Sequence, residues 1–110
     1  MMSLMTEAAG LYSTLADDPD MGELVELFVD ELPARIAALT AAFAAGDVVT
    51  LGRCAHQLKG AAGSYGFDAM TPALLQLEQA ARQGQAEKEL QPLLQEVTSL
   101  SLRIRSGLPQ

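Results

Sequence analysis

The sequence predicts an all-α protein, an up-down-up-down antiparallel four-helix bundle with a short additional helix near the N-terminus. Three observations lead to this prediction. Apolar residues make up 49% of the chain, but aromatic residues make up only 5% and tryptophan is absent, so the core must be mostly aliphatic, as in helical bundles. Apolar residues recur every three or four positions over most of the sequence. Short segments that contain glycine or proline separate these runs.

The longest apolar run predicts a helix over about residues 20–45. The sequence DPD at 18–20 is a helix-start signal, because acidic residues favour a helix N-terminus, and Gly46 ends the run. Pro33 lies inside it, but the apolar spacing continues in phase across the proline, so we expect one kinked helix rather than two. The expected inward side chains are Leu24, Leu27, Phe28, Leu32, Ile36, Leu39 and Phe43.

Three further helices are predicted after this one, and LYSTLADD (residues 11–18) predicts the short N-terminal helix. Asp47 can cap the second helix, whose inward residues are Val48, Leu51, Ala55, Leu58, Ala62 and Tyr65. The third begins at Asp68 or Thr71 and ends at Gly84, with Met70, Leu74, Leu77 and Ala81 inward and Gln76, Gln79 and Arg82 outward. The fourth spans about 86–105, with Leu90, Leu93, Leu94, Val97, Leu100 and Ile104 inward.

Length and charge restrict the class of protein. A chain of 110 residues argues for a single domain, 1–110, whose ordered core spans about 11–106. Its formal net charge of −7 argues against binding nucleic acid or an anionic membrane surface. Cys54 is the only cysteine, so no internal disulfide can form. We find no secretory signal and no apolar stretch long enough to span a membrane, and therefore expect a cytoplasmic protein. No extra apolar face demands a dimer, so we expect a monomer.

The only histidine, His56, lies in the glycine-rich stretch CAHQLKGAAGSYG (residues 54–66). A helix turns 100° per residue, which places His56 about 130° from the centre of the inward face, so the ring points outward. The residues expected to share its face are Gly52, Arg53, Lys59, Gly60 and Gly63. The three glycines reduce helix propensity by about 2–3 kcal/mol in total, and clearance for a macromolecular partner explains that cost. Close helix packing is excluded as an explanation for Gly60 but stays open for Gly63 and Gly66.

The chemistry that suits this exposed ring is covalent phosphorylation. One histidine without a neighbouring cluster of ligands does not make a metal site. A hydrolase needs an orienting partner and an oxyanion site, which nothing else in the chain supplies. Imidazole is a good nucleophile near neutral pH, and Lys59 can hydrogen-bond phosphoryl oxygens. The small residues allow a second protein's active site to close over the ring.

The stretch AHQLKGAAGSYGF (residues 55–67) resembles the signature of histidine-containing phosphotransfer (HPt) domains, and LFVDELPARIAAL (27–39) is similar to the family's long helix with its proline. The residues that match the signature are His56, Leu58, Lys59, Gly60, Ala61, Ala62 and Gly66. The resemblance covers about residues 11–106. The sequence departs from the family pattern at Ala61 and Ala62, where serine is frequent, and at Tyr65.

The resemblance implies a phosphorelay intermediate, which is a phosphocarrier and not an enzyme. His56 would carry the phosphoryl group on the ring nitrogen furthest from the backbone, and Lys59 would stabilise it. Gly60 would keep the approach open, and Gln57 would hydrogen-bond near the site. The implied partners are response-regulator receiver domains and hybrid sensor kinases. Mg²⁺ and the acidic pocket would belong to the receiver, so the resemblance implies no cofactor and no metal in this chain.

We expect receiver docking on the face around His56. The candidate contact residues are Val49, Gly52, Arg53, Gln57, Gly60, Gly63 and the loop of Phe67. Two alternatives stay open: a docking module that is not phosphorylated, and the phosphoacceptor module of a larger sensor kinase. A purely structural helical protein is a third class, and it leaves the glycines around His56 unexplained.

Overall fold

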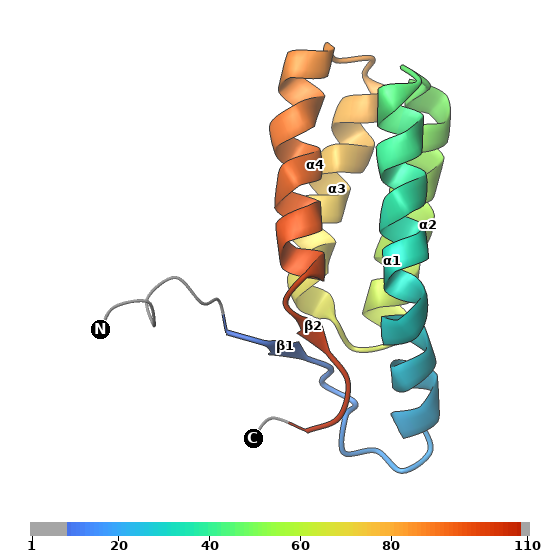
Figure 1. Ribbon diagram of the computed structural model, residues 1–110, viewed down its shortest axis with the longest axis vertical. Helices are drawn as coiled ribbons and strands as arrows, with labels where there is room; N and C mark the ends of the chain where they lie inside the picture. The colour runs from blue at the N-terminus through green and yellow to red at the C-terminus, as the bar shows by residue number, and fades with distance from the viewer. Residues whose placement is uncertain (1–8, 109–110) are drawn as a thin grey trace, which may run out of the picture.

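The computed structural model describes residues 9–108, and within them the chain forms four α-helices. They are α1 (Gly22–Ala44), α2 (Val48–Ser64), α3 (Thr71–Arg82) and α4 (Glu87–Ser101), with a 3₁₀ turn, η2 (Asp68–Met70), before α3. In Figure 1 the chain runs up the page in α1, down in α2, up in α3 and down in α4, and the helices lie side by side. The predicted all-α class with four helices is therefore confirmed. The predicted domain, 1–110, extends beyond the described residues.

Helix α1 is continuous through Pro33, as the phase of its apolar residues predicted. Two predictions for its first turns are wrong, because Leu24 and Leu27 are exposed and Val25 is buried in their place. Both sets have helical spacing, so spacing alone does not choose between them. Figure 1 shows the first turns of α1 extending past the ends of the other helices, which leaves one side of these turns without a neighbour.

Helix α2 begins where predicted. Asp47 caps it by accepting hydrogen bonds from the backbone nitrogen of Thr50 at 3.0 Å and from its hydroxyl at 2.7 Å. These hydrogen bonds hold the pKa of the Asp47 carboxyl below its usual range. Gly46, at φ +70°, makes the tight connection from α1. The buried residues of α2 include four of the predicted inward positions, Leu51, Ala55, Leu58 and Ala62.

The predicted short N-terminal helix is wrong. Leu11–Tyr12 form a strand, β1, which pairs in parallel with β2 (Ile104–Arg105). Further hydrogen bonds join this segment to distant residues: Ser13 donates its hydroxyl to the carbonyl of Tyr65, and Thr14 donates its backbone N–H to Gly66. These long-range partners satisfy backbone groups that an isolated short helix would leave exposed, and short helices are marginal in water.

The end of the chain also differs from the prediction. Helix α4 ends at Ser101 and not near residue 105, because the chain turns there to form β2. Ile104 is buried as predicted, but from the strand. Within residues 9–108, no helix is both long enough and apolar enough to cross a membrane.

The core fills the space between the four helices and closes below α2 with aromatic rings. Phe67 stacks on Phe28 with ring centroids 5.5 Å apart, and Tyr65 lies against the same ring at 5.4 Å. Gly66, between them, has φ +83°, and a Cβ there would collide with Ser13 and Thr14, so only glycine fits. This packing fixes the end of α2 and the turn that leads to α3.

Candidate functional site

His56 lies on the outward side of α2, as its helical position predicted. Its neighbours Ala55 and Leu58 are buried and hold α2 against the core, which leaves the side chain of His56 57% exposed. The ring leans toward α3, where Nδ1 lies 2.9 Å from Oε2 of Glu78. The site is therefore an exposed imidazole with one of its two nitrogens already held by a neighbouring helix.

Glu78 is the centre of the polar contacts around this ring. The side chain of Glu78 is only 9% exposed, and its carboxylate oxygens contact three side chains. Besides Nδ1 of His56, Nζ of Lys59 lies 2.8 Å from Oε1, and Nη2 of Arg82 lies 3.1 Å from Oε2. The hydrogen bond from Lys59 is the main cause that lowers the pKa of Glu78, and the hydrogen bond from His56 adds to it, while burial opposes both.

The contact between His56 and the ionised carboxylate of Glu78 determines which ring nitrogen is free. An ionised carboxylate only accepts hydrogen bonds, so Nδ1 of His56 must be the donor. A neutral imidazole has one N–H, and with that hydrogen on Nδ1 the lone pair available for bonding is on Nε2. In this tautomer the free lone pair is on Nε2, which is the ring nitrogen further from the backbone.

The two cations around Glu78 differ in their freedom to move. Lys59 follows His56 by one turn of α2, and its side chain is 24% exposed, whereas that of Arg82 on α3 is 61% exposed. Lys59 is thus held between the two helices by the buried carboxylate. Arg82 contacts the same carboxylate from the solvent side.

The glycines around His56 have different roles. Nothing lies within 4 Å of where a Cβ would stand at Gly60 or Gly63, and both are exposed, so the surface beside the ring is open there. The prediction that Gly52 belongs to this open face is wrong. Gly52 is buried, and a Cβ there would lie 3.5 Å from Cγ of Arg82 and 3.6 Å from Cβ of Ala81. Gly52 therefore faces α3, at a place with room only for a small side chain.

The other predicted contact residues are placed as follows. Val49, Arg53 and Gln57 are all exposed on α2, although Gln57 points about 100° away from His56 around the helix. Phe67 is buried under α2, so the prediction that it contacts a partner is wrong. The reason is its stacking on Phe28, which a helical wheel of α2 does not include.

Sequence reasoning missed Glu78 and treated Arg82 only as an outward residue of the third helix. One signal was present: Glu78 stands between Leu77 and the buried Ala80–Ala81, at the edge of the inward face of α3. A carboxylate at such an edge needs partners, and α2 supplies them because a short turn joins the two helices. Across residues 9–108, the structure groups no three His, Cys, Asp or Glu side chains in a way that would hold a metal ion.

Comparison with known proteins identifies the family. The family model described as "Hpt domain" matches residues 23–107, which include all of α2 to α4 and nearly all of α1. Comparison with curated proteins and with solved structures finds no significant match. Hpt domains are phosphocarriers of two-component signalling that interact with receiver domains and kinases. The match covers most of the chain, including His56, Lys59 and Glu78, and the protein therefore belongs to the Hpt domain family.

Proposed function

We propose that this protein is a phosphorelay intermediate that carries a phosphoryl group on Nε2 of His56 between aspartates of receiver domains. The observation that carries the proposal is the contact between Nδ1 of His56 and the buried Glu78. It holds Nδ1 and leaves Nε2 free, on a side chain that is 57% exposed and that a partner's active site can reach. Family membership indicates the class of reaction, and this contact supports the choice of His56 and of its Nε2 atom.

In the proposed transfer, the lone pair of Nε2 attacks the phosphorus of a receiver's aspartyl phosphate. The new N–P bond forms while the bond from phosphorus to the aspartate oxygen breaks, and the aspartate leaves as a carboxylate. The imidazole keeps its hydrogen on Nδ1 and becomes positively charged. The carboxylate of Glu78, 2.9 Å from Nδ1, stabilises this charge as it develops. Passing the group to a second receiver reverses the same steps.

Lys59 has a second proposed role, beyond holding Glu78. It lies one turn after His56, so its ammonium can turn from Oε1 of Glu78 to the oxygens of a phosphoryl group on Nε2. The open backbone at Gly60 and Gly63 leaves room for the partner's active site. We place Mg²⁺ and the acidic pocket in the receiver, so the carrier uses no cofactor of its own in this mechanism.

A phosphotransfer assay tests the proposal. The protein is incubated with a panel of phosphorylated receiver domains, and the product is examined for a phosphoryl group that is acid-labile and base-stable. We expect such a product in the wild-type protein and in a Glu96→Gln control on the exposed side of α4, and none in His56→Ala. Labelling that survives in His56→Ala, or no transfer from any receiver, would overturn the proposal.

A further inference from the structure

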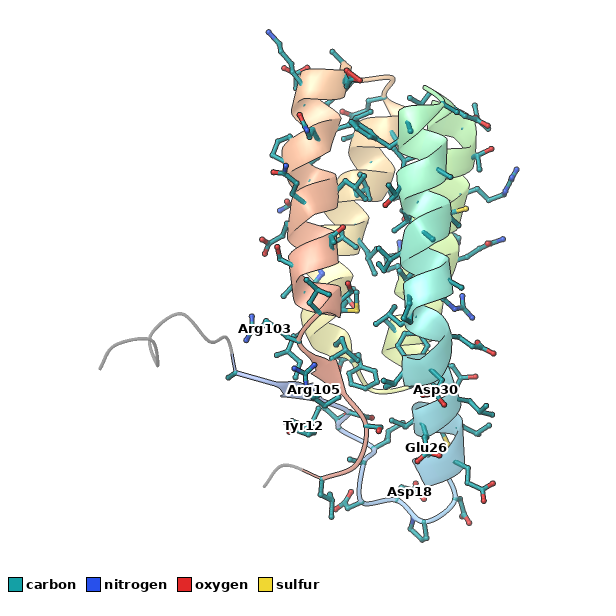
Figure 2. The ribbon with its side chains drawn as sticks, viewed as in Figure 1. Tyr12, Asp18, Glu26, Asp30, Arg103 and Arg105 are labelled. Carbon is teal, nitrogen blue, oxygen red and sulfur yellow. The ribbon has the colours of Figure 1, made fainter. Side chains whose placement is uncertain are left out.

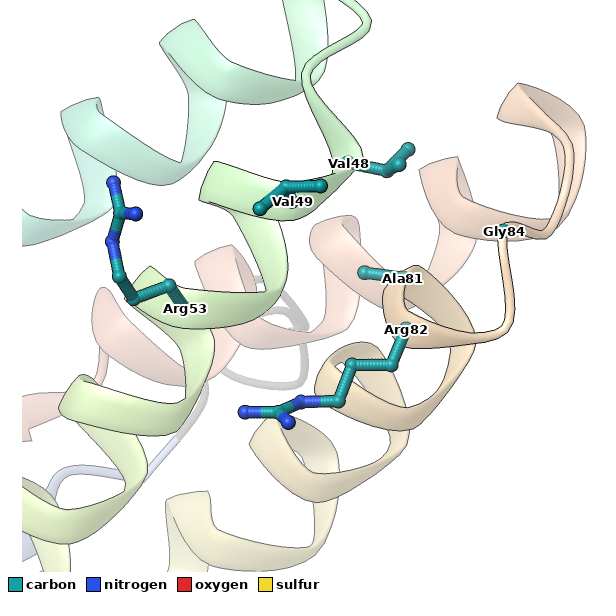
Figure 3. Close-up of a pocket in the computed structure, with 6 residues that line it drawn as sticks. All are labelled: Val48, Val49, Arg53, Ala81, Arg82 and Gly84. Carbon is teal, nitrogen blue, oxygen red and sulfur yellow. The ribbon is translucent and has the colours of Figure 1, made fainter.

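A second feature lies on the same side of the molecule as His56. Between the start of α2 and the end of α3 there is an open depression of about 540 Å³, shown in Figure 3. Its lining residues are Val48, Val49, Arg53, Ala81, Arg82 and Gly84. Valine and alanine side chains form an apolar floor, and the two arginines stand at its rim on different helices.

We propose that this depression is a docking subsite, separate from the phosphoryl-transfer centre, for a segment of the receiver that carries an acidic residue next to an apolar one. The inference rests on the proposed function, since it names what a receiver would place there. The apolar floor fits the apolar side chain, and the guanidinium groups of Arg53 and Arg82 fit the carboxylate. Charges at such a rim set the association rate and the choice of partner.

The distribution of charge supports an acidic partner at this place. The chain has 7 basic and 14 acidic residues, so a cluster of basic groups is unusual for it. Three of the seven, Arg53, Lys59 and Arg82, lie on the face shared by α2 and α3. The acidic groups on this face are Glu78, which is buried and contacts three basic or polar side chains, and Asp47, which is hydrogen-bonded to Thr50.

The remaining basic residues do not line the depression. Arg35 pairs with Glu31 on α1 at 3.7 Å, and Lys88 is at the start of α4. Arg103 and Arg105 lie beside Tyr12 at the strand pair in Figure 2, where both bind backbone carbonyls. By contrast, in the described part of the chain Arg53 forms no ion pair within 4.0 Å, although it is close enough to Asp47 to lower that carboxyl's pKa.

The distance from the transfer centre is compatible with one partner that covers both places. Val49 precedes His56 by seven residues on α2, which is about 10 Å along the helix axis. A standard protein interface covers about 800 Å² on each partner, a patch about 30 Å across. A receiver centred on His56 therefore reaches the depression. The side chain of Val49 is 73% exposed and is the apolar group that such a contact would bury.

Two variants test the subsite, each with a matched control. Arg53→Glu reverses the rim charge, and Lys88→Glu makes the same change at the start of α4. Val49→Asp places a charge on the apolar floor, and Leu102→Asp does so at a position of nearly equal exposure, 72% against 73%. Arg82 is left unchanged because it also contacts Glu78.

The rate of transfer is measured from the receiver domain that transfers fastest to the wild-type protein, at low and at high salt. We expect Arg53→Glu and Val49→Asp to lower the second-order transfer rate about tenfold, with the Arg53→Glu loss shrinking at high salt because salt screens surface charges. Labelling of His56 by phosphoramidate, a donor too small to use the depression, should change less than twofold in both. The two control variants should transfer at the wild-type rate.

Three results would count against these expectations, and they differ in which proposal they overturn. Wild-type transfer that proceeds while Arg53→Glu and Val49→Asp keep the wild-type rate would overturn the docking subsite and leave the proposed function intact. A wild-type protein that accepts no phosphoryl group from any receiver would overturn the proposed function and the subsite with it. An equal loss in phosphoramidate labelling and in receiver transfer would also overturn the subsite, since the defect would then lie in the chemistry.

Discussion

Oε2 of Glu78 on α3 lies 2.9 Å from Nδ1 of His56 on α2, although the two residues are 22 positions apart in the sequence. The distance depends on how closely the two helices pack, and Gly52 lies in the contact between them, where there is room only for a small side chain. The contact therefore links helix packing to the chemistry of the site. The carboxylate that lies between the two helices also determines which imidazole nitrogen is free.

Glu78→Gln keeps the shape of the side chain but removes its charge. We expect transfer to His56 to slow about ten- to hundredfold, because a hydrogen bond to a charged group contributes about 1.5–3 kcal/mol and this one stabilises the imidazolium that forms. The measurement is the transfer rate from a saturating phosphorylated receiver. Glu96→Gln on α4 is the control. A Glu78→Gln protein that transfers at the wild-type rate would show that the carboxylate only joins the helices.

The lowered pKa of Glu78 also predicts a pH dependence of stability. In the unfolded chain this carboxyl titrates at about 4.3, and in the folded protein it titrates below that value. Its stabilising contribution is therefore complete above about pH 4.3 and is lost as the pH falls through the folded pKa. We expect the free energy of unfolding of wild type to exceed that of Glu78→Gln at pH 7, and the gap to shrink below pH 4.3. Urea unfolding at a series of pH values measures this gap. A constant difference from pH 7 to pH 3 would contradict it.

Sequence reasoning was most reliable where structure depends on neighbours along the chain. Apolar spacing correctly predicted four of the six inward residues of α2 and the inward Leu74, Leu77 and Ala81 of α3, and the phase of the apolar residues predicted that α1 continues through Pro33. Sequence reasoning failed where the local structure depends on contacts with a segment that is distant in the sequence. Strand β1 forms because Leu11 pairs with Ile104 of β2, and the local sequence pattern carries no information about that pairing.

In the candidate site, too, the features of a single helix could be predicted and those that depend on two helices could not. The outward position of His56 follows from its place on one helix, and so does the nearness of Lys59 one turn later. Glu78 belongs to a second helix, and the wheel of each helix says nothing about the distance between them. Gly52 was misassigned for the same reason, since the residues that cover it are on α3.

Lys59→Ala should affect transfer more than folding. Lys59 pairs with the buried Glu78, which keeps His56 and Arg82 as partners, so we expect a loss of about 1.5–3 kcal/mol in the free energy of unfolding, too little to unfold the bundle. Transfer should slow about tenfold or more, because the phosphoryl oxygens lose a charged donor. Thermal unfolding and the transfer rate are measured on the same samples, with Lys88→Ala as the control. A large fall in melting temperature together with normal transfer would assign Lys59 a purely structural role.

Two substitutions at Gly52 test whether helix packing sets the site geometry. Gly52→Ala adds a Cβ at ordinary contact distance, 3.5 Å from Arg82 and 3.6 Å from Ala81, and should be tolerated. Gly52→Leu overfills the same space and should cost about 1–3 kcal/mol of stability by pushing α3 away. Because that movement separates Glu78 from His56, transfer should fall in Gly52→Leu even at temperatures where the variant is fully folded. Normal transfer in a folded Gly52→Leu protein would contradict this coupling.

Gly60→Glu tests whether the open surface beside His56 is where a receiver approaches. A Cβ at Gly60 meets nothing within 4 Å, so the variant should fold, and replacing glycine inside a helix should even stabilise it slightly. The added carboxylate fills the approach and repels the receiver's acidic pocket, so receiver binding should weaken about tenfold or more. The control is Gly22→Glu in the first turn of α1, where a Cβ also meets nothing within 4 Å. Binding is measured with an unphosphorylated receiver, so that chemistry does not contribute. A partner that closes over the ring must contact a carboxylate placed beside His56, and its affinity must then change. Equal affinity in the wild-type, Gly60→Glu and Gly22→Glu proteins would therefore place the docking face elsewhere on the molecule.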